Sequence, residues 1–96
     1  MRVIISPLAQ QQIKDASKWH NKQQKGLGAR FTKSIRDTIN ILKVNPFYQI
    51  RYSNVRILNT KTFSYLIHYV VKDKEKMIII FGVFHASRNI DHYIKK

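Results

Sequence analysis

Residues 77–85 read MIIIFGVFH, and every position except Gly82 and His85 carries an apolar side chain. The run is too short to cross a bilayer, and a strand that is apolar on both faces is typical of the interior of a sheet. We therefore predict that residues 77–85 form a central strand. The β-branched Val3, Ile4 and Ile5 predict a short strand over residues 2–5, which we expect to lie beside the central strand and parallel to it.

Two further strands are expected before the central one. Side chains alternate over residues 62–71, with one face formed by Phe63, Tyr65, Ile67, Tyr69 and Val71. Residues 55–59 predict another strand, and the polar residues 72–76 predict the turn that leads into the central strand. Residues 47–53 are expected to form a loop, and residues 86–96 a polar and basic tail.

The segment between the first strand and residue 46 predicts two helices. Ser6-Pro7 is typical of an N-cap followed by proline at the first helical position, so a helix is expected over residues 7–21. Gly26-Leu27-Gly28 predicts a turn, and a second helix is expected from residue 29 to residue 44, before Asn45-Pro46. The second helix has an apolar stripe formed by Phe31, Ile35, Ile39 and Leu42. The first helix has a weaker one, formed by Leu8, Ile13, Ala16 and Trp19 or His20, and we expect Trp19 in the core.

These elements predict one α+β domain over residues 1–96. An N-terminal strand is followed by an antiparallel helix hairpin, which packs on one face of a small, mostly antiparallel sheet of about four strands.

The composition limits what such a domain can do. Eighteen Lys and Arg residues face five Asp and Glu residues in 96 positions, which gives a formal charge of +13. This charge indicates a polyanionic partner, whether nucleic acid, an acidic protein or a membrane surface. The chain has no cysteine, no signal-peptide core and no long apolar segment, so we expect a cytoplasmic protein. We also expect no metal and no cofactor, because neither metal-ligand spacing nor a glycine-rich phosphate loop is present.

Three groups of residues are candidates for function. His85 and Arg88 follow the central strand, where they could act as acid or base and as phosphate ligand, or could merely cap the strand. The face of the second helix opposite its stripe is a candidate binding surface or a merely solvated face, and it carries Arg30, Lys33, Arg36 and Lys43. The third group consists of Phe47, Tyr48, Arg51, Tyr52 and Arg56, of which we expect Phe47 in the core and Arg51 and Tyr52 on a binding surface.

Five short motifs occur in an order that resembles the RelE/ParE family of bacterial toxins. They are Ser6-Pro7-Leu8-Ala9, the run from Gly26 to Phe31, Asn45-Pro46, the run from Ser64 to Tyr69, and the run from Phe84 to Arg88. The resemblance implies a toxin of a type II toxin–antitoxin system, with a helix hairpin on a small sheet and a cognate antitoxin as partner.

The family divides by target, and the resemblance favours its ParE-like side, which is associated with DNA gyrase. RelE-like nucleases cut messenger RNA on the ribosome and carry basic side chains at positions where this chain has Arg56, Leu58 and Leu66. They also place an arginine soon after the last strand, where this chain has Ala86 with Arg88 close by, and a tyrosine further on, near Tyr93, so two or three of the expected cations are missing. The alternative is therefore a metal-independent endoribonuclease that uses His85, Arg56, Arg88 and Tyr93, so enzymatic activity is left open. A third hypothesis is a non-toxic module that binds nucleic acid.

Overall fold

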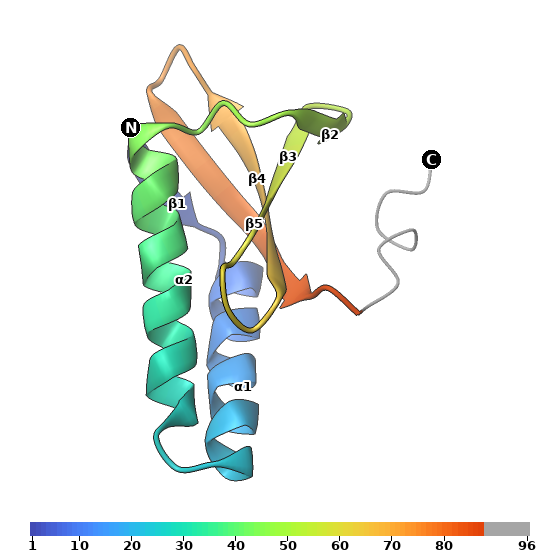
Figure 1. The fold of residues 1–96 in the computed structure, drawn as a ribbon. Coiled ribbons are helices and arrows are strands. Elements are labelled where there is room, and N and C mark those ends of the chain that lie inside the picture. Colours follow the sequence, from blue (N-terminus) through green and yellow to red (C-terminus); the bar gives the residue numbers. More distant parts are fainter. Residues whose placement is uncertain (88–96) are drawn as a thin grey trace.

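A computed structural model describes residues 1–87 of the chain and shows two helices packed against a five-stranded sheet (Figure 1). In chain order the elements are β1 (Arg2–Ile5), α1 (Pro7–Gln23), α2 (Leu27–Val44), β2 (Ile50–Tyr52), β3 (Val55–Asn59), β4 (Tyr65–Lys72) and β5 (Met77–His85). The strand order is β1-β5-β4-β3-β2, and only the β1–β5 pair is parallel. The α+β class, the helix hairpin and the parallel first strand are therefore confirmed.

The strand β5 lies inside the sheet, as its apolar sequence predicts. Its first half pairs with β1, from Arg2 opposite Met77 to Ile5 opposite Ile80. Its whole length pairs with β4, and the register shifts there from Gly82 opposite His68 to Ile80 opposite Tyr69. Phe81 is thus the extra residue of a β-bulge, which changes the side-chain alternation of the strand at that point.

The core lies between the helices and the near face of the sheet. Its fully buried members include Phe31 and Leu42 from α2, Ile67 and Tyr69 from β4, and Ile78 and Ile80 from β5. Burial of each such side chain stabilises the fold by roughly 2 kcal/mol. The predicted stripe of α2 is confirmed, since Ile35 is also buried and Ile39 packs against the same cluster.

The α1 helix begins where Ser6 Oγ accepts the amide of Ala9 at 3.1 Å, and Pro7 occupies its first turn.

The turn between the helices brings their backbones close together. Gly26 has a φ of 87°, a conformation that favours glycine, and it caps the start of α2. A Cβ at Gly28 would lie 2.6 Å from the carbonyl oxygen of Ser17, so only glycine allows this separation of α1 and α2.

The sheet differs from the sequence prediction at its outer strands. It has five strands instead of about four, because Ile50–Tyr52, expected in a loop, forms the edge strand β2. Three residues with an irregular register are too few to give a periodic pattern. The strand β4 starts at Tyr65 and not at residue 62, because Phe63 and Ser64 have φ values of 71° and 52° and form a turn.

Three side chains expected to be buried are exposed. Leu8 is 63% exposed, Trp19 57% and Phe47 52%. Of the two residues considered at the end of the α1 stripe, His20 is the buried one, and Ala9 is buried in place of Leu8, while Ile13 and Ala16 pack against the core as expected. Helical spacing thus predicted the middle of the α1 stripe correctly, and the errors are Leu8 and Trp19 at its two ends.

The helices of residues 1–87 include none with the length and apolar content that a bilayer crossing requires.

Replacing Gly28 by Ala should lower the free energy of unfolding by about 1–3 kcal/mol, because the new methyl group forces α1 and α2 apart. Urea denaturation monitored by circular dichroism measures this change. The matched control is Ala29→Ser at the next, exposed position, where a change within about 0.5 kcal/mol is expected. An unchanged midpoint for Gly28→Ala would contradict the close helix contact.

Candidate functional site

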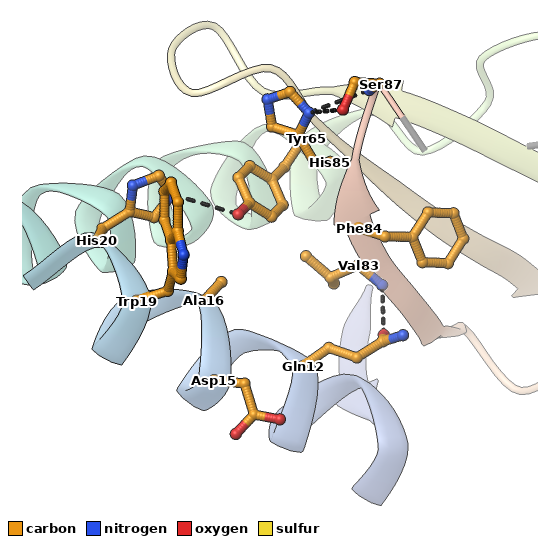
Figure 2. Close-up of a pocket in the computed structure, with 10 residues that line it drawn as sticks. All are labelled: Gln12, Asp15, Ala16, Trp19, His20, Tyr65, Val83, Phe84, His85 and Ser87. Atoms are coloured by element: carbon orange, nitrogen blue, oxygen red, sulfur yellow. Dashed lines mark hydrogen bonds between the residues drawn. The ribbon is translucent and has the colours of Figure 1, made fainter. Parts of the chain in front are cut away.

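The C-terminal half of β5 has an open outer edge, because β1 is too short to accompany it. The pairing with β1 ends at Ile80, whose carbonyl accepts the amide of Ser6 at 2.8 Å just before α1 begins. Further along, the amide of Val83 donates to the side-chain carbonyl of Gln12 at 2.7 Å (Figure 2). A side chain of α1 thus occupies the place that a neighbouring strand would take.

A groove of about 610 Å³ lies between α1 and this open edge. Its lining consists of Gln12, Asp15, Ala16, Trp19 and His20 from α1, Tyr65 from β4, Val83, Phe84 and His85 from β5, and Ser87. In Figure 2, Trp19 and His20 stand at one end of the groove, and Tyr65 lies between them and His85. The exposed indole and the open strand edge give this groove the features of a protein-binding site.

Behind Trp19, the side chains of His20 and Tyr65 contact each other and two further aromatic rings. His20 Nε2 lies 3.2 Å from the hydroxyl oxygen of Tyr65, and the His20 ring stacks on Phe31 with 5.2 Å between centroids. Tyr65 in turn meets the ring of His85 edge-on at 5.3 Å. Burial, and secondly the charge of His85, lower the pKa of His20 below its ordinary value, so His20 is a neutral partner that holds Tyr65 in place.

His85 is exposed at the mouth of the groove, and its tautomer follows from its contacts. The backbone amide of Ser87 donates to His85 Nδ1 at 3.0 Å, and the hydroxyl of Ser87 lies 2.8 Å from the same nitrogen. A ring nitrogen that accepts an amide proton carries none itself, so the neutral ring holds its proton on Nε2. In this arrangement Nε2 is a hydrogen-bond donor and has no free lone pair with which to act as a base.

Arg56 and His85, which were expected to act together in a nuclease site, lie far apart in the sheet. Arg56 pairs with Tyr69 and His85 pairs with Tyr65, and four residues of strand span about 13 Å. The guanidinium of Arg56 donates to the carbonyl of Tyr48 and lies 5.4 Å above the ring centroid of Phe47. Within residues 1–87, no lysine or arginine lines the groove.

The other predicted site residues lie away from the groove. Arg30, Lys33 and Arg36 are exposed on α2, and Lys33 forms an ion pair with Asp37 at 2.8 Å. Arg51 is exposed on β2. Arg88 and Tyr93 lie outside the described residues.

The half-buried Tyr52 belongs to a cluster around His68 on the face of the sheet away from the helices. Its hydroxyl lies 3.2 Å from Nδ1 of His68, which is 1% exposed, and the ring of Phe84 lies 4.5 Å from that of His68. Burial, and secondly the charge of Arg51, lower the pKa of His68 to about 4. His68 is therefore a neutral core residue at physiological pH.

Sequence reasoning did not identify two parts of the groove. Gln12 belongs to a run of three glutamines that only weakens the apolar pattern of α1. Tyr65 and His20 are 45 residues apart, and no local spacing relates them. The exposed position of Trp19 follows from the length of β1, which ends before it can cover this side of α1 and β5.

Comparison with known proteins places this geometry in a family. The family model described as "ParE toxin of type II toxin-antitoxin system, parDE" matches residues 3–90. Among solved structures, the chain is similar to one in the crystal structure of the intact E. coli RelBE toxin–antitoxin complex, with a TM-score of 0.67 and 12% sequence identity. The similarity covers 91% of this chain and 98% of that chain, and it concerns the fold. No curated protein sequence matches the chain significantly.

The burial of His68 predicts a loss of stability in acid. Because its pKa of about 4 in the folded state lies below the ordinary value of 6.5, the unfolded chain binds this proton more tightly. The free energy of unfolding should therefore fall between about pH 6.5 and pH 4, by on the order of 3 kcal/mol from this residue, and His20 adds to the loss in the same direction.

Denaturation in urea across this pH range measures the slope, and the variant His68→Phe should flatten it. NMR titration of the ring protons gives an independent reading, in which His68 should stay unprotonated until the pH approaches 4. A slope that is unchanged in His68→Phe would show that other groups cause the acid loss.

Proposed function

Since the chain belongs to the ParE toxin family of type II toxin–antitoxin systems, we propose that it inhibits growth by acting on DNA gyrase and that a cognate antitoxin neutralises it. The composition of the groove is the observation that supports gyrase, rather than messenger RNA, as the target of the chain. Cleavage of RNA without a metal needs a base for the 2′-hydroxyl and cations for the developing charge on the phosphate. Among residues 1–87, no lysine or arginine lines the groove and the guanidinium of Arg56 is held by the carbonyl of Tyr48, so the groove supplies no guanidinium or ammonium group for the phosphate.

The groove between α1 and β5 is the proposed binding site for the antitoxin. An extended segment could replace the Gln12 amide at the open edge of β5 and pair with Val83. Trp19 would then be covered by an apolar side chain of that segment. The exposed cations Arg30, Lys33 and Arg36 would attract an acidic antitoxin from a distance. Both proposed partners are cytoplasmic, which is the compartment we propose for the chain.

Expression of the chain alone should stop growth, and expression with the gene encoded beside it should restore growth. The purified chain should inhibit the supercoiling activity of gyrase, and DNA breaks should accumulate in cells while transcripts stay intact. Primer extension on transcripts after induction is the control. New discrete cuts within codons would instead support the endoribonuclease alternative. A chain that binds DNA in a salt-dependent way without stopping growth would support the non-toxic binding module.

Trp19→Ala should weaken binding of the antitoxin about 30-fold or more, because truncation of a central aromatic anchor costs about 2 kcal/mol or more. Calorimetric titration of the purified pair measures this affinity. The matched control is Phe47→Ala, since Phe47 is a similarly exposed aromatic residue, 52% against 57%, that lies outside the groove. Equal losses in both variants would argue against the groove as the antitoxin site.

A further inference from the structure

A second hollow lies on the helix hairpin, away from the groove. It is an open cleft of about 620 Å³ where α1 meets the start of α2, and we call it the hairpin cleft. Its lining consists of Ser17, Lys18, Asn21, Lys22, Gly28 and Ala29, none of which lines the groove. With 3.6 residues per helical turn, the α1 residues of the cleft and those of the groove lie on opposite sides of the helix. A partner bound in the groove therefore leaves the hairpin cleft open.

The lining of the hairpin cleft is polar and positively charged. Lys18 and Lys22 are exposed, and neither forms an ion pair within residues 1–87. The other lining residues supply a hydroxyl, an amide and the small residues Gly28 and Ala29. The described lining thus has no carboxylate, no aromatic ring and no apolar side chain larger than a methyl group.

The sequence around the hairpin cleft adds further positive charge. Between Asp15 and Asp37 the chain has six lysine and arginine residues and no acidic residue. Asp15 lines the groove instead, and Asp37 is in an ion pair. Lys14, Lys18 and Lys22 recur every four residues, so they form one row along α1 that is roughly 12 Å long. We call these three residues the lysine row.

The hairpin turn holds the backbone around the cleft in place. Oδ1 of Asn21 accepts the amides of Gly26 and Gly28 at 2.9 Å and 3.4 Å, and the hydroxyl of Ser17 donates to the carbonyl of Gly28 at 3.2 Å. In Figure 1 this end of the hairpin projects beyond the sheet, so a large partner can reach it without meeting the strands. A surface that is ordered before binding has a lower entropic cost of association.

The chemistry of the lining favours a nucleic-acid duplex over a protein as the partner. A protein partner needs apolar or aromatic anchors, and a single strand needs aromatic rings on which its bases stack. The described lining offers neither. Lysine, serine and asparagine side chains are among those with which proteins contact the phosphates of DNA. Along the roughly 12 Å of the lysine row, a DNA duplex carries about seven phosphate charges.

We propose that the hairpin cleft and the lysine row bind the phosphate backbone of duplex DNA. Contacts with phosphates carry no sequence information, so this binding is independent of the base sequence. The biological meaning of the inference rests on the proposed function, in which the DNA is the segment that gyrase holds. The toxin then contacts the complex of gyrase with DNA and not the enzyme alone, while the groove on the other side of α1 remains the site of the antitoxin.

The test compares two double variants of the full chain that remove the same charge. Lys18→Gln with Lys22→Gln removes both lysines from the cleft lining. Lys72→Gln with Lys74→Gln removes two exposed lysines from the end of β4 and the turn that follows, which lies at the opposite end of the molecule in Figure 1. Fluorescence anisotropy with a 20-base-pair DNA duplex, repeated at several salt concentrations, measures binding.

The cleft variant should bind the duplex at least about tenfold more weakly than the wild type. The slope of log affinity against log salt concentration should also become shallower by about two, because two phosphate contacts are lost. The control at the β4–β5 turn should change both quantities little. In a gyrase supercoiling assay, the cleft variant should need a concentration about tenfold higher for the same inhibition, and the control variant should act like the wild type.

A second pair of variants adds a negative charge and keeps every lysine. Ala29→Glu places a carboxylate in the cleft, and a negative charge near the N-terminus of α2 favours that helix, so the melting temperature should not fall. Binding of the duplex should again weaken at least about tenfold. The matched control is Asn40→Glu at an exposed position near the other end of α2, where little change is expected.

Four results would overturn the inference. Equal losses in the matched variants would show that only the net charge of the chain matters. A loss of antitoxin affinity in the cleft variants would show that the cleft is a protein contact. Tighter binding of a 20-nucleotide single strand than of the duplex would contradict a phosphate-backbone site. Tighter binding of a 20-base-pair RNA duplex would identify RNA as the polyanion and would favour the endoribonuclease alternative.

Failure of the inference can be told apart from failure of the proposed function. A wild-type chain that stops growth and inhibits gyrase without binding duplex DNA overturns the inference and leaves the proposed function intact. A chain that binds duplex DNA through the cleft without slowing growth refutes the proposed function, while the loss of binding in the cleft variants still supports the cleft as a DNA site.

Discussion

The fold is organised around the burial of β5. Its apolar side chains point to both faces, so each face needs a layer and each edge needs a neighbour. The helices cover one face, where Ile78, Ile80 and Val83 are buried, and the cluster of His68 and Phe84 lies on the other. The strand β4 pairs with one edge throughout. Only four residues of β1 pair with the other edge, along the first half of β5. The second half of that edge has no neighbouring strand among the described residues, and the groove lies there.

Three histidines show how position in the fold divides chemical roles. His68 and His20 are buried beside tyrosine hydroxyls, and burial lowers the pKa of both. Both therefore serve as neutral hydrogen-bonding members of the core. His85, at the end of β5, is exposed and oriented by Ser87. The only histidine of the three that a ligand could reach is thus the one at the open end of the strand.

The charge of the chain and its exposed apolar residues have related physical consequences. With so few carboxylates, most of the lysine and arginine residues have no partner of opposite charge and repel one another. The ion pairs among the described residues are Lys33 with Asp37 and Lys76 with Asp73, both exposed, and such pairs stabilise little. An acidic partner that also covers Trp19 or Phe47 would reduce the repulsion and the apolar exposure together, which is consistent with a toxin kept in complex with its antitoxin.

The amino-acid sequence was enough to predict the fold class, the central place of β5, the parallel β1, the helix hairpin and the buried stripe of α2. Each follows from a periodic pattern or from a turn residue, and these are local properties of the chain. The three-dimensional structure was needed to find that Trp19 and Phe47 are exposed, that Gln12 binds Val83, and that Arg56 lies far from His85. Periodicity shows which side of an element is apolar, but a side chain is buried only where a neighbouring element extends far enough to cover it. That depends on the length of β1 and on pairings between residues distant in the sequence, which no local pattern records.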